Sequence, residues 1–268
     1  MKKRKNFIRE KKIFCGDYLE VDIIPKTKID KRTPEKRNKK KKVSAPKQRR
    51  LNDKNARRYF IQLVNTNFNE DDLHLNVTYS DDELPASIEE AEKEVKNYIR
   101  RIDYRRKKEG LPPTRYVLVT EGTVEKGGED IIRIHHHLYI NGGLDRDVVE
   151  SLWRRRRRKG EKEGKRIGYV NADRLQPNNF GLEGLSRYLM KNPKGKKRWS
   201  CSQNLERPTQ RNNDHRYTKR EVERIVKDYS EDQTYWEKKY PGYWFTECKT
   251  EYNDLTGWSI YLKLRRSG

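Results

Sequence analysis

His135 and His137 are the two side chains whose type and spacing point most directly to chemistry. Residues 133–140 alternate apolar and polar side chains, as in a β-strand, where successive side chains point to opposite faces. We therefore expect His135 and His137 on one face and His136 on the other, apolar face. Two imidazoles on one face of a strand can bind one metal ion, whereas a single histidine on a strand is more often a core or surface residue. An expression tag does not explain the triplet, because it lies mid-chain within an apolar alternation.

Glu121 is the candidate third metal ligand. It belongs to a predicted strand at residues 115–123, and a glycine-containing turn at 125–130 leads from there to the histidine strand. If that turn is centred near Gly127, Glu121 shares the face of the histidine pair, whereas a slip of one residue places it on the opposite face. Two imidazoles and a carboxylate suit Mn²⁺ or Mg²⁺ with open positions for phosphate oxygens. The alternative for Glu121 is an ordinary surface carboxylate at a strand end.

Tyr188 and Lys191 form a Tyr-x-x-Lys pattern within a helix predicted at residues 180–192. Residues three apart share one face of a helix. A phenol is a weak nucleophile unless a cation stabilises the phenolate, and a lysine one turn away and a nearby metal ion both do so. The alternative for Tyr188 is a residue at the edge of the core, because Leu185 and Leu189 make the helix amphipathic.

Three segments together resemble the motifs of a known superfamily. A strand at residues 75–79, the His-x-His strand and the Tyr-x-x-Lys helix occur in this order. Over about residues 70–200 the chain is similar to the HUH endonucleases, specifically to the single-tyrosine replication initiator proteins of rolling-circle phages and plasmids. Two positions depart from the family pattern: His136 stands where the family has a bulky apolar residue, and Asn76 where threonine is common.

The resemblance implies a palm-like fold and a function in DNA nicking. It implies that His135, His137 and Glu121 hold a divalent metal ion, and that Tyr188, assisted by Lys191, attacks a scissile phosphate of single-stranded origin DNA. The products would be a 5′-phosphotyrosine and a free 3′-OH that primes rolling-circle replication. The chain contains no Gly-x-x-x-x-Gly-Lys-Ser/Thr stretch. A helicase, like the polymerase, is therefore expected from the host.

The remaining pattern predicts an α+β fold, with a central, mainly antiparallel sheet and flanking helices. Strands are expected at residues 72–79, 115–123, 133–140 and 166–175. Helices are expected at residues 57–67, 87–108, 144–157, 180–192 and 218–229. The helix at 87–108 has the clearest signals, since Ser87 can cap it and its first turn is acidic. A C-terminal hairpin is expected to join residues 242–249 to 258–264.

The expected domains are a partly disordered basic arm at residues 1–58, an endonuclease domain at 59–200 and a C-terminal extension at 201–268. The extension, a helix plus a hairpin, is expected to pack on the catalytic domain. Within the arm, residues 13–25 alternate like a strand or hairpin, which we expect to dock on the main domain at a sheet edge. The basic run Lys39–Lys42 is expected in a solvated linker that also contacts phosphates.

The charge of the chain favours a polyanionic partner. Its 64 Lys and Arg residues exceed its 41 Asp and Glu residues, giving a formal net charge of +23. The unbroken series Arg154–Arg158, expected at the end of the helix at 144–157, is a candidate for nucleic-acid contact. No apolar run approaches the roughly 18 residues that span a bilayer. Three separated cysteines argue against a disulfide framework or a zinc ribbon, so we expect a reducing, bacterial cytoplasm.

Three other functions are compatible with these residues. A related HUH relaxase or single-strand transposase would use the same chemistry for conjugative transfer or transposition. A non-enzymatic nucleic-acid-binding protein would use the histidines only structurally. A hydrolytic nuclease would use the two histidines without tyrosine chemistry and would leave a free 5′-phosphate.

Overall fold

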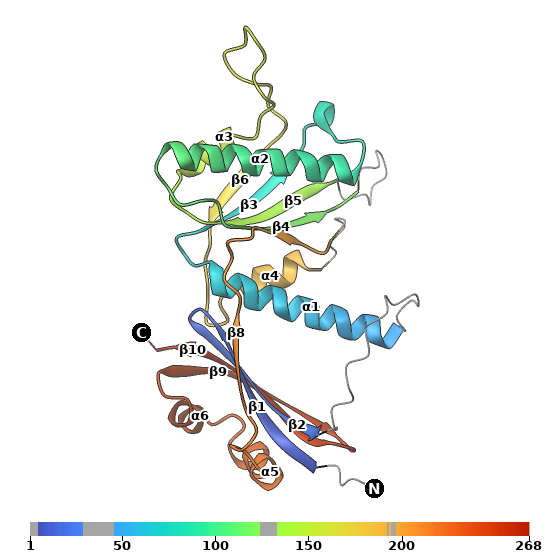
Figure 1. Cartoon of the computed structure of the whole chain (residues 1–268), viewed down its shortest axis with the longest axis vertical. Coiled ribbons are helices and arrows are strands. Elements are labelled where there is room, and N and C mark those ends of the chain that lie inside the picture. The colour runs from blue at the N-terminus through green and yellow to red at the C-terminus, as the bar shows by residue number, and fades with distance from the viewer. Residues whose placement is uncertain (1–4, 29–45, 124–132, 192, 194–196, 268) are drawn as a thin grey trace. The chain divides into compact units, whose positions relative to one another are not determined.

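The structure, a computed structural model, describes residues 5–28, 46–123, 133–191, 193 and 197–267 (Figure 1). The chain forms two compact units. The first consists of Met1–Thr66, Asn179–Gly181 and Arg207–Gly268, and the second of Asn67–Asn178 and Leu182–Glu206. Each unit contains one five-stranded antiparallel sheet and helices, which confirms the expected α+β class. Among the helices of the described ranges, none is both long and apolar enough to cross a bilayer.

The second unit has a β-α-β-β-α-β order of elements. These are β3 (Leu73–Thr78), α2 (Ile88–Lys108), β4 (Tyr116–Glu121), β5 (His135–Ile140), α3 (Arg146–Ser151) and β6 (Val170–Arg174). The strand order is β6-β3-β5-β4, with β7 (Ser200–Cys201) beside β4, and every pairing is antiparallel. This is the split βαβ arrangement of ferredoxin-like folds. The short helices η1 (Asp81–Glu83) and α4 (Glu183–Leu189) complete the unit.

Helix α2 covers one face of this sheet because its apolar side chains recur at helical spacing (Figure 1). Ser87 caps its N-terminus by accepting a hydrogen bond from the Glu90 backbone N–H. The helix and the sheet share one core, formed by Ala91, Val95, Tyr98, Ile99 and Ile102 of α2 and by Leu75, Val77, Leu138 and Ile140 of the strands. Because strand side chains alternate, the other face of β3, β4 and β5 carries His74, Asn76, Val119, Glu121, His135 and His137.

Helix α3 ends at Ser151, six residues before the end of the helix predicted at 144–157. The expectation that Arg154–Arg158 continue a helix is therefore wrong. The fully buried Trp153 explains the break, because its indole N–H donates to the Thr78 carbonyl at 2.9 Å and ties the chain to β3. From there Arg154 pairs with Arg166 in an isolated antiparallel bridge instead of following the helical path.

The first unit is built from both ends of the chain. Its sheet has the order β8-β1-β2-β10-β9, with β1 (Lys5–Cys15), β2 (Tyr18–Lys28), β8 (Thr209–Asn213), β9 (Tyr243–Asn253) and β10 (Gly257–Arg266). Helices α5 (Lys219–Asp228) and α6 (Gln233–Lys239) share an apolar core with it. Helix α1 (Pro46–Asn67) contains the helix predicted at 57–67 and contributes Arg58, which pairs with Glu20 and Asp22 of β2. The β1–β2 turn needs Gly16, because its φ is 63° and an added Cβ would lie 2.7 Å from the Asn65 carbonyl oxygen.

The structure of the first unit differs from two expectations drawn from the sequence. The N-terminal hairpin is present, but it does not dock on the sheet of the second unit: β2 pairs with β10 and β1 pairs with β8. The two compact units also differ from the expected division at residues 1–58, 59–200 and 201–268, because residues 207–268 join residues 1–66. The run Lys39–Lys42 and the expected turn at 125–130 lie outside the described residues.

Candidate active site

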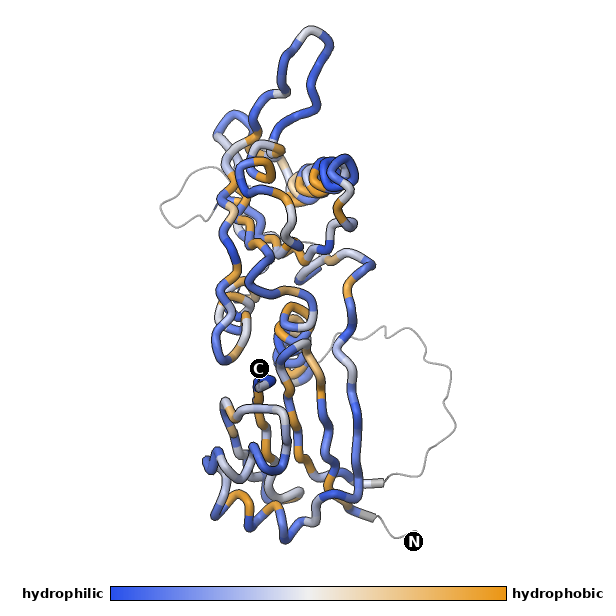
Figure 2. The backbone as a smooth tube through the Cα atoms, turned by 90° about the vertical axis from the view of Figure 1, so that its left-hand side faces the viewer, coloured by the Kyte–Doolittle hydropathy of each residue, from blue (hydrophilic) through white to orange (hydrophobic). Residues whose placement is uncertain are grey.

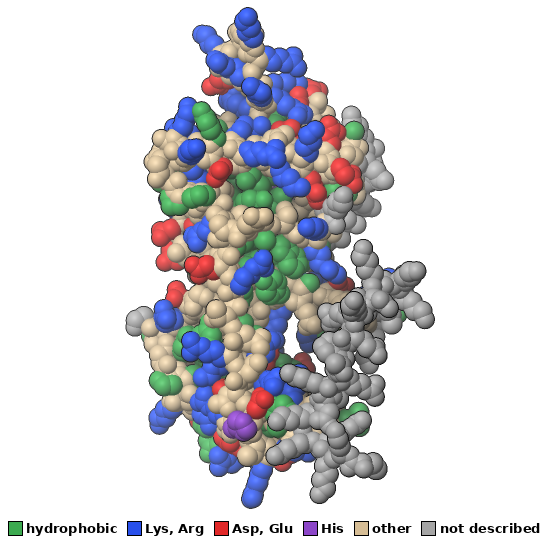
Figure 3. All heavy atoms as spheres, viewed as in Figure 1, with side chains coloured by type: hydrophobic (Ala, Val, Ile, Leu, Met, Phe, Trp, Pro, Cys, Tyr) green, Lys and Arg blue, Asp and Glu red, His purple; other side chains and the backbone are tan. Residues whose placement is uncertain are grey.

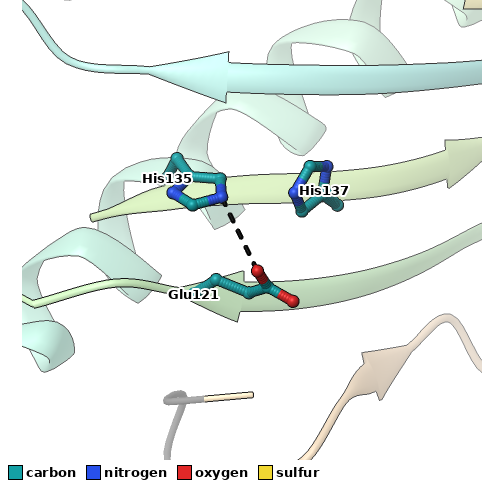
Figure 4. Close-up of side chains that lie close together, drawn as sticks. All are labelled: Glu121, His135 and His137. Carbon is teal, nitrogen blue, oxygen red and sulfur yellow. Dashed lines mark ion pairs between the residues drawn. The ribbon is translucent and has the colours of Figure 1, made fainter. Parts of the chain in front are cut away.

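The strand register places Glu121 with the histidine pair. Glu121 of β4 lies directly opposite His135 of β5, so the two side chains share one face of the sheet. His137 points to the same face two residues along β5 (Figure 4). One ligand atom from each of Glu121, His135 and His137 lies within 4.8 Å of the others. The structure therefore brings together the three side chains that the sequence nominated as metal ligands.

The hydrogen bond of His135 defines which of its nitrogens can bind a metal ion. Its Nδ1 lies 2.8 Å from the Arg133 carbonyl oxygen, which can only accept, so the proton is on Nδ1. The lone pair is then on Nε2, which faces Glu121 Oε2 at 3.8 Å. A carbonyl that orients the second nitrogen of an imidazole is a common feature of histidine metal ligands.

His137 is the more buried member of the pair. Its Nδ1 lies 3.2 Å from His74 Nε2, whereas its buried Nε2 has no hydrogen-bond partner among the described residues. Glu121 Oε1 is also buried without a partner in that part of the chain. Burial and the neighbouring His74 and His135 lower the pKa of His137 to about 3, so it is neutral at ordinary pH, as a metal ligand must be.

Two unsatisfied buried atoms beside a third ligand atom fit a divalent cation. Leaving a buried polar atom without a partner costs about 1–3 kcal/mol. Coordination would satisfy His137 Nε2 and Glu121 Oε1 together, and a site of two imidazoles and one carboxylate leaves positions open for other oxygens. Burial raises the pKa of the Glu121 carboxyl, while His135 and Lys191 oppose that shift. A bound cation would keep the carboxyl ionised.

Helix α4 presents Tyr188 at the edge of this site. The helix is fixed to the histidine face of the sheet by the buried Ser186, whose hydroxyl lies 3.1 Å from the Tyr139 hydroxyl. Leu189 and Met190 are also buried, which leaves Tyr188 60% exposed. Its ring centroid lies 6.1 Å from that of His137, in an edge-on arrangement. Tyr188 is thus an exposed phenol beside a predicted metal ligand and not a core residue.

Lys191 lies just beyond α4, which ends at Leu189, so it does not share a helix face with Tyr188 as predicted. Its backbone N–H donates to the Tyr188 carbonyl at 3.0 Å, and the residue is exposed. Its charge acts on the Glu121 carboxyl, which places the ammonium group in electrostatic range of the three ligand side chains. The three predicted ligands therefore share one face of the sheet, with Tyr188 of α4 beside His137 and Lys191 in electrostatic range of Glu121.

His136 lies on the opposite face of β5 and is fully buried. Its Nε2 lies 2.9 Å from the Tyr79 hydroxyl and its Nδ1 lies 2.9 Å from Thr120 Oγ1. Burial lowers the pKa of His136 to about 3, so the imidazole is neutral. Both nitrogens are satisfied, which explains how the core face of β5 holds a histidine.

Replacing His136 by leucine is expected to destabilise the fold by about 1–3 kcal/mol, because Thr120 then keeps a buried hydroxyl without its partner. The double variant His136→Leu/Thr120→Val should recover part of that loss. Urea unfolding of the wild type and both variants measures the effect. A double variant no more stable than the single one would contradict this account.

His74 and Asn76 are site residues that the sequence analysis did not nominate. His74 contacts His137 through the 3.2 Å hydrogen bond, and Asn76 lies opposite His137 with a buried side-chain oxygen that lacks a partner in the described residues. The alternation of residues 72–79 puts both on the polar face of their strand. The sequence alone did not show that this strand, β3, pairs directly with the histidine strand, β5.

His74 is a positioning residue for His137. A metal ion at His137 Nε2 requires the proton on Nδ1, which then donates to His74 Nε2. We expect His74→Ala to weaken Mn²⁺ binding about tenfold, as for other partners of metal ligands, and His74→Gln, which keeps an acceptor, to recover most of it. Calorimetric titration with Mn²⁺ measures both. Equal affinities for wild type and His74→Ala would remove this role.

Comparison of the chain with models of protein families, with curated proteins and with solved structures found no match. Because a ferredoxin-like topology carries many unrelated functions, the functional argument rests on the geometry of the site itself.

Proposed function

We propose that this protein nicks and rejoins single-stranded DNA at a replication origin, as an HUH-type initiator of rolling-circle replication. One observation carries the proposal. The three ligand atoms of Glu121, His135 and His137 lie within 4.8 Å of one another, and the exposed phenol of Tyr188 stands beside His137 on the same sheet face. A metal site with an adjacent, accessible tyrosine favours phosphotyrosine chemistry over a purely structural histidine strand.

In this mechanism Tyr188 is the nucleophile. Its oxygen forms a bond to the scissile phosphorus as the bond from phosphorus to the 3′ oxygen breaks. The phenol proton passes, in net, to the departing 3′ oxygen. The protein is left joined to the 5′ phosphate, and the freed 3′-OH can prime a host polymerase. The reverse reaction rejoins the strand without ATP.

The other side chains bind and orient the reacting groups. Glu121, His135 and His137 would hold Mn²⁺ or Mg²⁺, which supplies Lewis-acid polarisation of phosphate oxygens when bound. His74 fixes the tautomer of His137, and the Arg133 carbonyl fixes that of His135. Lys191, exposed next to Tyr188, can bind the scissile phosphate or balance the charge of the phenolate.

The test is to incubate the protein with Mn²⁺ and single-stranded oligonucleotides from its own replicon, labelled at either end. Denaturing gels should show the 3′-labelled fragment attached to protein and the 5′-labelled fragment free, with a 3′-OH that a polymerase extends. EDTA should abolish both products.

Other products would select other functions. A free 5′-phosphate without an adduct indicates a hydrolytic nuclease, and tight metal-independent binding without cleavage indicates a nucleic-acid-binding protein. Relaxases and single-strand transposases share the nicking chemistry, so replication of a plasmid carrying the cognate origin is the assay that distinguishes an initiator from them.

A further inference from the structure

A basic finger, defined as residues 154–166, connects α3 to β6. It contains nine Lys or Arg residues and two Glu residues. Its two arms meet at the base, where Arg154 bridges Arg166 and the Arg155 N–H donates to the Lys165 carbonyl at 2.7 Å. Near the tip the Glu161 N–H donates to the Arg158 carbonyl at 3.2 Å. The finger is thus a loop closed at its base, which extends from the second unit and is hydrophilic along most of its length (Figures 1 and 2).

The cations at the base of the finger form ion pairs with glutamates of the second unit. Arg155 pairs with Glu94 at 2.6 Å and with Glu83 at 2.9 Å, and Lys165 pairs with Glu83 at 2.8 Å. Arg154 pairs with Glu163. The close approach of the arms also requires a glycine, because a Cβ at Gly164 would lie 1.8 Å from the Arg155 carbonyl oxygen. These contacts fix the base of the finger to the rest of the second unit.

The tip carries cations of a different kind. Five exposed side chains, within the described part of the chain, have neither an ion pair nor a side-chain hydrogen bond: Arg156, Arg157, Arg158, Lys159 and Lys162. The nearby Glu161 carboxylate accepts from the Arg158 backbone N–H at 2.8 Å instead of pairing with a cation. Lys and Arg side chains gather at this end of the second unit in Figure 3. Adjacent cations repel one another, so a polyanion that neutralises them binds favourably.

We propose that the tip of the finger binds the phosphate backbone of duplex DNA. Guanidinium groups bind phosphates in a bidentate manner, so the adjacent Arg156, Arg157 and Arg158 at the tip suit a phosphate backbone. Residues 155–165 contain no aromatic side chain, so this segment lacks the stacking surfaces with which proteins bind single strands. Duplex DNA also presents twice the phosphate density of one strand.

The finger begins at the end of the sheet that carries the metal-site residues. The Trp153 side chain just before it donates to the Thr78 carbonyl, and the Thr78 N–H donates to the Tyr169 carbonyl just after it, at 2.8 Å. Thr78 lies directly opposite His135. The root of the finger is therefore one strand away from His135. The inference rests on the proposed function, and it names the duplex adjoining the nicked single strand as a further partner.

The test compares a finger variant, Arg156→Gln/Arg157→Gln/Arg158→Gln, with a matched control, Lys93→Gln/Arg100→Gln/Lys107→Gln. The control removes three exposed cations from one face of α2, where the residues recur at a seven-residue spacing. Fluorescence anisotropy gives the Kd for a duplex and for a single strand of equal length at several salt concentrations.

The finger variant should bind the duplex at least about tenfold more weakly at low salt. The slope of log K against log salt should fall by about 0.9 for each phosphate that the variant no longer neutralises. The control, and the charge-preserving Arg156→Lys/Arg157→Lys/Arg158→Lys, should stay within about threefold of wild type.

An equal reduction in affinity for the duplex and the single strand would overturn the assignment to duplex DNA, and an unchanged duplex affinity would overturn nucleic-acid binding by the finger altogether. Two further measurements separate this inference from the proposed function. The finger variant should nick a single-stranded oligonucleotide at the wild-type rate, and His137→Ala should bind duplex DNA as wild type does. If the protein shows no nicking activity but its duplex binding depends on the finger, only the proposed nuclease function is refuted.

Discussion

Replacing Tyr188 by phenylalanine is expected to lower the yield of covalent protein–DNA adduct by at least about a thousandfold, because the variant lacks the only atom of this side chain that can bond to phosphorus. The ring itself is retained, so its edge-on contact with His137 should persist. Metal affinity and DNA affinity should therefore remain close to those of the wild type. The measurement is a denaturing gel of end-labelled single-stranded DNA with Mn²⁺ and equal amounts of each protein.

The matched control is Tyr104→Phe. Tyr104 is 62% exposed, almost the same as Tyr188, but it lies on α2, which covers the opposite face of the sheet. This variant should form the adduct as wild type does. An adduct that survives Tyr188→Phe would keep the enzyme class and assign the nucleophile to another tyrosine, which peptide mapping of the adduct would identify.

Replacing His137 by alanine is expected to weaken Mn²⁺ binding by more than about a hundredfold, since loss of a ligand exceeds the 10–100-fold effect of losing a ligand's partner. His137 Nε2 is one of the buried atoms that lack a hydrogen-bond partner in the described chain. Glu121→Gln, which keeps the shape but removes the negative charge, should have an effect in the same direction. Calorimetric titration with Mn²⁺ reads the affinity directly, without DNA and without activity.

His136→Leu provides the control on the same strand. This substitution removes the imidazole of the neighbouring residue, which lies on the core face of β5. The Mn²⁺ affinity of the variant should therefore match that of the wild type at temperatures where the variant is folded. Circular dichroism checks the fold of each variant. Similar decreases of affinity in His136→Leu and His137→Ala would show that the effect arises from the strand and not from coordination.

The elements with strong local signals were predicted from the sequence. The alternation of residues 72–79 and 133–140 gave β3 and β5 and divided their side chains between two faces. The capping serine and the glycine-proline stop gave α2 to within a residue. The C-terminal hairpin was also predicted, because its strands are long and contain many aromatic and β-branched residues. These patterns depend on neighbouring residues, which is why they can be read without knowing the tertiary structure.

Other features depend on contacts that no local pattern encodes. Only the pairing of β4 with β5 fixes the face of Glu121, and the contact of His74 with His137 depends on β3 lying beside β5. The early end of α3 follows from burial of Trp153 against β3, against the helical preference of the following arginines. The sheet of the first unit pairs β2 with β10, strands separated by most of the chain. The short strands β7 and β8 lie where the sequence predicted no strand.

Synthesis from the N-terminus separates the two halves of the first unit in time. β2 is made before the second unit, whereas its partner β10 is made after it. All of the second unit is translated between them, which takes on the order of ten to thirty seconds at about 5–20 residues per second. Domains generally fold as they emerge from the ribosome, so the second unit can fold while one edge of β2 is still unpaired. An open strand edge is a template for pairing with other chains. A chain truncated before β10 would therefore keep the Glu121, His135 and His137 cluster while exposing a strand edge that can pair with other chains.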